Sequence, residues 1–256
     1  MATRGHPPSE DVGDMPRTFF RKAAIALVLG IASFALGACT SPSSQDSEEP
    51  FAPKASTLNN AGLYGPGETI EVGGIIAGGK DQPKGGEVSV GYPSIMRMTS
   101  PPEGVSVSDF KGGAFDESSS EAMKEQLGFA PGPEGSLPLG YSYVVVELAM
   151  SNTGSETVSY DVSQGRFIEV DEAGAVSSIG MNDPLWHDAW EGGNLKLYWI
   201  VDIEAGATLE IKLLYVLPDD AINDKRLAYL VDPGSANGEE GFVGLEAFDV
   251  AGQIRG

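Results

Sequence analysis

The chain has 256 residues, of which 41% are hydrophobic and 21% are charged, so it has enough apolar material for a core of domain size. Sixteen basic against 37 acidic residues give a net charge of -21. This charge argues against a nucleic-acid partner and against adsorption to anionic lipid, which both require a basic surface. The single Cys excludes an internal disulfide.

The N-terminal region has the pattern of a secretory signal peptide. Arg17, Arg21 and Lys22 supply a positive start, and residues 23–38 form an apolar run of small and aliphatic side chains. A run of about 16 residues is short for a membrane-spanning helix, which needs roughly 20. The pattern therefore predicts a leader over residues 1–38 that directs the chain out of the cytoplasm.

The end of this leader, Leu36-Gly37-Ala38-Cys39, resembles the lipobox of bacterial lipoproteins. The resemblance implies cleavage between Ala38 and Cys39, with a diacylglyceryl group on the Cys39 thiol. Two acyl chains hold a protein stably on a membrane where one does not. We therefore expect a lipid-anchored protein on the extracytoplasmic face of the cell membrane. The alternative is a signal-anchor helix with a chance Cys.

A spacer is expected after Cys39. Residues 40–62 are rich in Ser, Pro, Asn and acidic side chains and contain too little apolar surface to fold. Order is expected to begin near Gly67. The predicted organisation is therefore a signal peptide over residues 1–38, a lipidated Cys and disordered linker over 39–66, and a domain over 67–256.

The remaining chain is dominated by short strand patterns separated by Gly, Pro, Asn and Asp turns. Asp116–Leu127 is the one good helix candidate, with Asp116 or Ser118 as its N-cap and Gly128 at its end. Pro93 interrupts one strand, as expected at an edge or a bulge. Strands are expected over 68–76, 87–98, 105–110, 141–150, 156–162, 166–170, 175–178, 195–203, 208–217, 226–231 and 245–250. This pattern predicts an all-β, antiparallel β-sandwich with one short helix insertion.

Three strand endings carry a family resemblance: Asn152-Thr-Gly154 after a β-branched strand, Asp171-Glu-Ala-Gly174, and a Gly206-initiated strand that ends at Pro218. Together they resemble the telokin-like, immunoglobulin-like domain of uncharacterised secreted lipoproteins from Gram-positive bacteria. The resemblance covers roughly residues 141–231 and implies an immunoglobulin-like fold and an extracellular location. It brings no shared catalytic residues. Residues 116–127 and 179–194 depart from a minimal version of the domain, so a specific function could lie there.

Residues 183–190 form the most distinctive local cluster. Trp186 and Trp190 are four residues apart and would share a face on a turn of helix, and Trp199 follows on a predicted strand. Such rings can stack on a sugar or grip a peptide, which makes the three Trp residues candidate ligand-binding residues. The alternative is a small lid that closes one end of the sandwich, with the Trp rings in the core.

The polar residues suggest no catalytic or metal site. His187 is the one His after the leader, and we interpret it as a partly exposed loop residue in preference to a Ser/His/Asp triad with Asp183 or Asp188. The densest carboxylate run, residues 219–224, lacks the spacing of an EF-hand. We interpret it as solvated turn residues, with a calcium site as the alternative. No cofactor is expected.

These observations predict a non-enzymatic, cell-surface lipoprotein whose domain binds an extracellular protein, peptidoglycan or a polysaccharide. One alternative is a carbohydrate-binding module that uses Trp186, Trp190 and Trp199. A second alternative, from a different class, is a carboxylate-based extracellular hydrolase.

Overall fold

The computed structural model describes residues 56–59, 62–72, 88–181, 183–232, 235–236 and 242–256. The predicted leader, Ala38 and Cys39 lie outside these residues, as do most of the predicted spacer and residues 73–76 of the first predicted strand. Within the described part of the chain, no helix is both long and apolar enough to cross a membrane.

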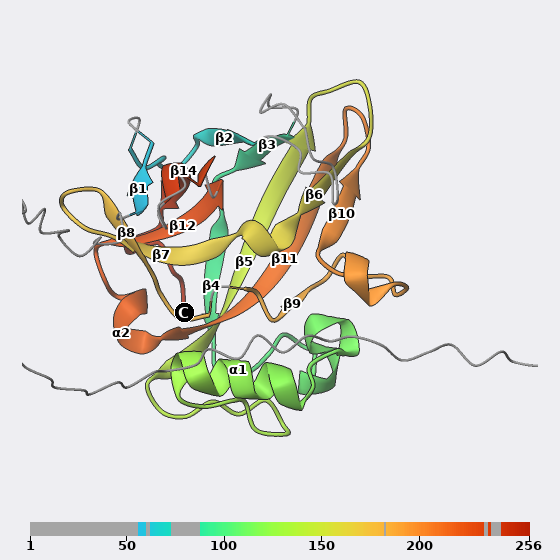
Figure 1. Ribbon diagram of the computed structural model, residues 1–256, viewed down its shortest axis with the longest axis vertical. Coiled ribbons are helices and arrows are strands. Elements are labelled where there is room, and N and C mark those ends of the chain that lie inside the picture. The colour runs from blue at the N-terminus through green and yellow to red at the C-terminus, as the bar shows by residue number, and fades with distance from the viewer. Residues whose placement is uncertain (1–55, 60–61, 73–87, 182, 233–234, 237–241) are drawn as a thin grey trace, which may run out of the picture. The chain divides into compact units, whose positions relative to one another are not determined.

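The described residues are mostly strands (Figure 1). The strands are β1 (Ser56–Leu58), β2 (Thr69–Val72), β3 (Val88–Gly91), β4 (Ser94–Met98), β5 (Tyr141–Asn152), β6 (Val158–Asp161), β7 (Arg166–Val170), β8 (Ala175–Ser178), β9 (Trp186–His187), β10 (Ile200–Ile203), β11 (Thr208–Pro218), β12 (Leu227–Asp232), β13 (Ser235–Ala236) and β14 (Phe242–Asp249). The α-helices are α1 (Glu117–Leu127) and α2 (Asp219–Ile222), and the 3-10 helices are η1 (Val107–Gly113), η2 (Val162–Gln164) and η3 (Leu195–Leu197).

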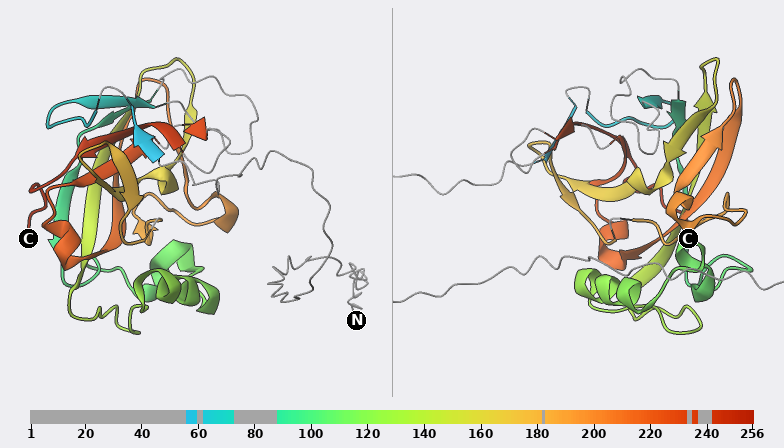
Figure 2. Two further views of the ribbon diagram at one scale, coloured as in Figure 1. Left: turned by 60° about the vertical axis from the view of Figure 1, so that its left-hand side comes forward. Right: turned by 45° about the vertical axis from the view of Figure 1, so that its right-hand side comes forward.

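The first sheet closes on itself. Its strand order is β1-β8-β7-β12-β14-β13, and β1 also pairs with β14, so β1, β8, β7, β12 and β14 form a ring. The pairing of β1 with β14 is parallel, whereas the other strand pairings of the described residues are antiparallel. The antiparallel prediction therefore fails at the pair that closes the ring. The curvature of β7, β12 and β14 can be followed in Figure 2.

The second sheet has the order β2-β3-β5-β11-β9, and β4 pairs with β5 beside β3. A third, two-stranded sheet joins β10 to β6. Val90 of β3 pairs with Met150 of β5, and Ser94 of β4 pairs with Glu147 of β5. The two pairs are four positions apart on the β3–β4 side but three positions apart on β5, so one extra residue forms a bulge at Tyr92-Pro93. The predicted interruption at Pro93 is confirmed, because proline cannot donate a ladder hydrogen bond.

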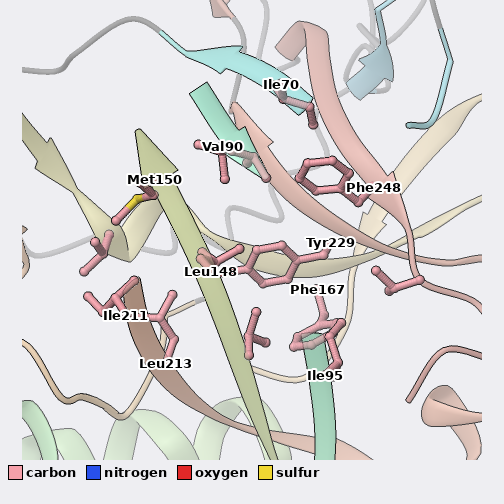
Figure 3. Close-up of a cluster of buried hydrophobic side chains, with 14 of the residues drawn as sticks. Ile70, Val90, Ile95, Leu148, Met150, Phe167, Ile211, Leu213, Tyr229 and Phe248 are labelled. Atoms are coloured by element: carbon pink, nitrogen blue, oxygen red, sulfur yellow. The ribbon is translucent and has the colours of Figure 1, made fainter. Parts of the chain in front are cut away.

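The central core lies between the two large sheets. Figure 3 shows Phe167, Tyr229 and Phe248 of the first sheet facing Leu148 and Ile211 of the second. The residues that alternate with these along β7, β12 and β14 point to the opposite face of the first sheet, because side chains alternate along a strand. They fill a second cluster, made of Ile168, Val170, Ala228, Leu230, Leu245 and Ala247. The three strands β7, β12 and β14 are thus buried on both faces.

A third cluster covers part of the outer face of the second sheet. Tyr143 and Val145 of β5 and Leu214 and Val216 of β11 pack there beneath η1 and α1. This cover explains why residues 143–146 are continuously apolar, as is typical of strands buried on both faces. The two packed sheets confirm a mostly β fold with a helical insertion.

The predicted helix is confirmed. The side chain of Asp116 caps α1 by accepting a hydrogen bond from Ser119 N at 2.9 Å. Gly128 ends it with a φ of 80°, a left-handed conformation that glycine adopts without steric cost. Two predicted turn residues also act as expected. Asn152 donates to the carbonyls of Glu156 and Ile203, and Asp171 accepts from the backbone of its own hairpin turn.

Three predicted boundaries are wrong. Residues 107–110 belong to η1 and not to a strand, because Ser106 and Asp109 form a capping box and Lys111 has a φ of 51°. Residues 195–197 form η3, so the predicted strand over 195–203 is reduced to β10. Ser56–Leu58, assigned to the linker, form β1, because they pair with β8 and β14.

Candidate functional site

The structure separates the three candidate Trp residues. Trp186 lies in β9 opposite Leu214 of β11, and its half-buried ring packs on the cluster beneath η1 and α1. A turn follows β9, so Trp186 and Trp190 do not share a helical face and that prediction is wrong. The extended conformation follows from the pairing of Trp186 and His187 with β11.

Trp190 and Trp199 meet at a different place, around Tyr198. The Tyr198 ring lies 5.2 Å from the Trp190 ring and 4.5 Å from the Trp199 ring, centroid to centroid, both edge to face. Trp199 also packs against the central core. Both Trp side chains are half-buried. This packing favours the interpretation of the segment as a closing element over that of an open sugar platform.

His187 is buried, with 1% of its surface exposed, so its interpretation as a partly exposed loop residue is wrong. The pairing of His187 with Leu213 carries it to the edge of the core, where its ring contacts Tyr198 and Trp199. Its Nε2 lies 2.6 Å from the carbonyl oxygen of Tyr198. Its Nδ1 has no hydrogen-bond partner among the residues that the structure describes, so neither Asp183 nor Asp188 orients the ring as a catalytic triad requires.

Burial lowers the pKa of His187, because desolvation disfavours its charged form. The hydrogen bond to the Tyr198 carbonyl and the nearby Asp188 oppose this effect more weakly. His187 is therefore a neutral structural histidine at neutral pH, with Nε2 as the donor.

A concave surface with polar lining lies on the outer face of the second sheet, beside the part that α1 and η1 cover. It is a groove of about 580 Å³. Its floor is the exposed face of β5 and β11, and its walls come from the β3–β4 bulge and the turn after β9. The lining residues are Tyr92, Ser94, Glu147, Leu148, Ala149, Asp188, Glu210, Ile211 and Lys212.

Small residues leave the groove open. Ala149 is exposed on the floor, and a Cβ built on Gly91 would lie 3.5 Å from the Ala149 carbonyl oxygen. Neither position carries a long side chain across the sheet. The bulge at Tyr92 forms one side of the groove next to Gly91 and Ala149. Tyr92 is fixed there, because its hydroxyl donates to the Asp249 carbonyl at 2.6 Å and its ring meets Phe248 edge to face.

Charged side chains line the groove in a defined register. Lys212 lies opposite Glu147, and their Nζ and Oε1 atoms are 2.9 Å apart. The hydrogen bond to Glu147 raises the pKa of Lys212. Asp188 accepts a hydrogen bond from the backbone N of Lys212 at 2.8 Å. Glu210, opposite Ala149, has no ion pair or side-chain hydrogen bond within the described residues.

The sequence pattern alone did not indicate this groove. Glu147, Glu210 and Lys212 interrupt two of the strongest apolar strand patterns, which is the signal that marks the solvent face of a strand. The sequence did not show which of these residues lie opposite each other, because register depends on pairing across more than sixty residues.

The carboxylates of residues 219–224 have protein partners. Asp219 contacts Arg97 and the Ser142 hydroxyl, and Asp224 pairs with Arg226. Among the described residues, no three His, Cys, Asp or Glu side chains gather as a metal-binding group. The run is better described as turn and ion-pair residues than as a calcium site.

Comparisons with known proteins provide little guidance. No family model matches the chain, and no curated protein matches it. A solved structure, an uncharacterized beta-sandwich protein from Clostridium difficile 630, is 10% identical with a TM-score of 0.28, over 78% of this chain and 98% of that chain.

Proposed function

We propose that this protein is a non-enzymatic binding module, held on the extracytoplasmic face of the membrane by a lipid on Cys39. The groove over β5 and β11 carries this proposal. It is an exposed part of the outer face of the second sheet, beside the part that η1 and α1 cover, and it has a largely polar lining. Ligand sites are commonly concave surfaces of about 300–1,000 Å³ with a few placed polar groups.

The anchoring part of the proposal rests on the sequence. The basic start, the apolar run and Leu36-Gly37-Ala38-Cys39 have the order that lipid attachment requires. We further propose an immunoglobulin-like arrangement for residues 141–231. This part is supported by the turns at Asn152 and Asp171, whose side chains hold the ends of neighbouring strands.

The role of the groove in binding is tested by a substitution that fills it with a large side chain. We would compare in-cell crosslinking of the wild type with that of Ala149→Trp, using Ala205→Trp as a control at an exposed turn outside the groove. Thermal unfolding would first establish that both variants fold. The proposal expects a crosslinked partner that Ala149→Trp loses and Ala205→Trp keeps. Equal capture by all three proteins would place binding elsewhere.

The anchor is tested by Cys39→Ser. The expected result is the loss of metabolic lipid label and release from the membrane fraction. A variant that stays membrane-bound with unchanged gel mobility would contradict lipid attachment. Turnover of cell-wall or glycan substrates by the wild type, abolished in Glu147→Gln, would contradict the non-enzymatic proposal and favour the hydrolase.

A further inference from the structure

We infer that the groove binds a peptide segment through one basic side chain, a lysine or an arginine, seated beside Glu210. This inference rests on the proposed function, because it names the ligand class of the same groove. It follows from the charge, the shape and the pairing of the side chains on the exposed face of β5 and β11.

The charge of the groove favours a cation. Three carboxylates, from Glu147, Asp188 and Glu210, line it together with one ammonium group, that of Lys212. The whole chain carries a net charge of -21, so the surrounding field has the same sign. An acidic ligand would be repelled, whereas a basic one is attracted.

The pairing within the groove limits the number of cations. Glu147 is neutralised by Lys212, and Asp188 accepts a hydrogen bond from the Lys212 backbone. Glu210 is left without a partner among the described residues. A single basic side chain of the ligand would pair with the Glu210 carboxylate. The Glu147–Lys212 pair and the Ser94 hydroxyl remain to meet peptide amides, which a simple polyamine lacks.

The shape fits the stem of such a side chain. Glu210 and Ala149 are directly opposed on neighbouring strands, so the carboxylate borders the hollow above the Ala149 methyl group. Lysine and arginine lay an aliphatic stem on apolar surface and keep the charged end near polar partners. Tyr92 lines the same groove, and its ring is held by Phe248.

The test is a titration of detergent-solubilised full-length protein with the capped pentapeptide acetyl-Ala-Ala-Lys-Ala-Ala-amide, followed by NMR chemical shifts. The matched peptide has norleucine in place of lysine, which keeps the stem and removes the charge. The protein variant is Glu210→Gln, and its control is Glu172→Gln, an exposed carboxylate in the β7–β8 turn.

We expect the lysine peptide to shift groove resonances and to lose about threefold to fivefold in affinity with Glu210→Gln, as for a partly exposed ion pair. Glu172→Gln should bind as the wild type does. The norleucine peptide should bind the wild type no better than the lysine peptide binds Glu210→Gln. Added salt should weaken the binding of the lysine peptide and leave that of the norleucine peptide unchanged.

No binding of the lysine peptide, equal binding of both peptides, or equal affinity with Glu210→Gln would overturn the inference. Tighter binding of spermidine than of the lysine peptide would also overturn it in favour of a free polyamine. The inference can also fail while the proposed function stands. If Ala149→Trp abolishes crosslinking in cells while Glu210→Gln leaves it unchanged, the groove is a binding site but its ligand is not basic.

Discussion

His187 and Tyr198 are joined twice, each side chain to the other's backbone. The His187 Nε2 lies 2.6 Å from the Tyr198 carbonyl oxygen, and the His187 backbone N donates to the Tyr198 hydroxyl at 3.3 Å. These bonds tie the short edge strand β9 to the chain just before β10. Because the next residue, Asp188, forms a wall of the groove, the same pair also fixes one side of the candidate site.

Low pH should reduce the stability that the His187–Tyr198 contact contributes to the fold. The folded-state pKa of His187 lies below its usual 6.5, so the unfolded chain takes up the proton first. The stability contributed by neutral His187 is present at neutral pH and is lost as the pH falls through about 6.5 towards the lower folded-state pKa. Urea unfolding at pH 7.5 and pH 5.5 should therefore show a larger loss for the wild type than for His187→Gln. Equal losses would mean that other groups cause the pH dependence.

The contact of η1 with Tyr198 can be tested at Gly112. A Cβ there would lie 2.6 Å from Tyr198 Cδ2, and the φ of Gly112 is 66°. Gly128 has a similar φ of 80° but open space around it. Gly112→Ala should therefore lower the free energy of unfolding by about 1–3 kcal/mol more than Gly128→Ala, because only the first overpacks a buried ring. Equal costs in chemical denaturation would contradict this packing.

Trp186 should behave as a core residue. Its ring packs on the cluster that joins η1 and α1 to the second sheet. Trp186→Ala should lower the free energy of unfolding by about 2–3 kcal/mol, at the low end for a large aromatic side chain because the residue is half-buried. A variant with unchanged stability in urea would indicate that the ring is free to bind a ligand.

The carbohydrate-binding alternative predicts that Trp190 and Trp199 contact a glycan, whereas the packing of these residues predicts that they do not. Their rings already contact Tyr198, so we expect soluble cell-wall glycans to leave Trp fluorescence unchanged. A saturable shift that disappears in a folded Trp190→Ala variant would favour a carbohydrate-binding module instead.

Asp219 should contribute more to stability than its neighbour Asp220. Its Oδ1 accepts from the Ser142 hydroxyl at 2.6 Å and lies 2.7 Å from Arg97 Nη2, which joins β4, β5 and the end of β11. Within the described part of the chain, the Asp220 carboxylate accepts a hydrogen bond from the adjacent Ala221 N alone. We expect Asp219→Ala to cost about 1–2 kcal/mol and Asp220→Ala about 0.5 kcal/mol or less. Thermal unfolding of the two variants provides the comparison.

The sequence by itself determined the local elements of the domain. The caps Asp116 and Gly128 predicted both ends of α1, and Pro93 predicted the bulge between β3 and β4. The alternation of Glu210, Lys212 and their apolar neighbours predicted β11. These features depend on bonds and side-chain directions within a few residues, so a short stretch of sequence contains their cause.

The tertiary structure alone decided how these elements combine. Pairing with β14 made Ser56–Leu58 a strand of a closed ring, although these residues have the composition of a linker. Pairing with β11 buried His187 and separated Trp186 from Trp190 and Trp199. The register of β5 with β11 placed Glu147 opposite Lys212 and left Glu210 beside Ala149. Each outcome depends on contacts between residues far apart in the chain, and such contacts depend on how the whole domain packs.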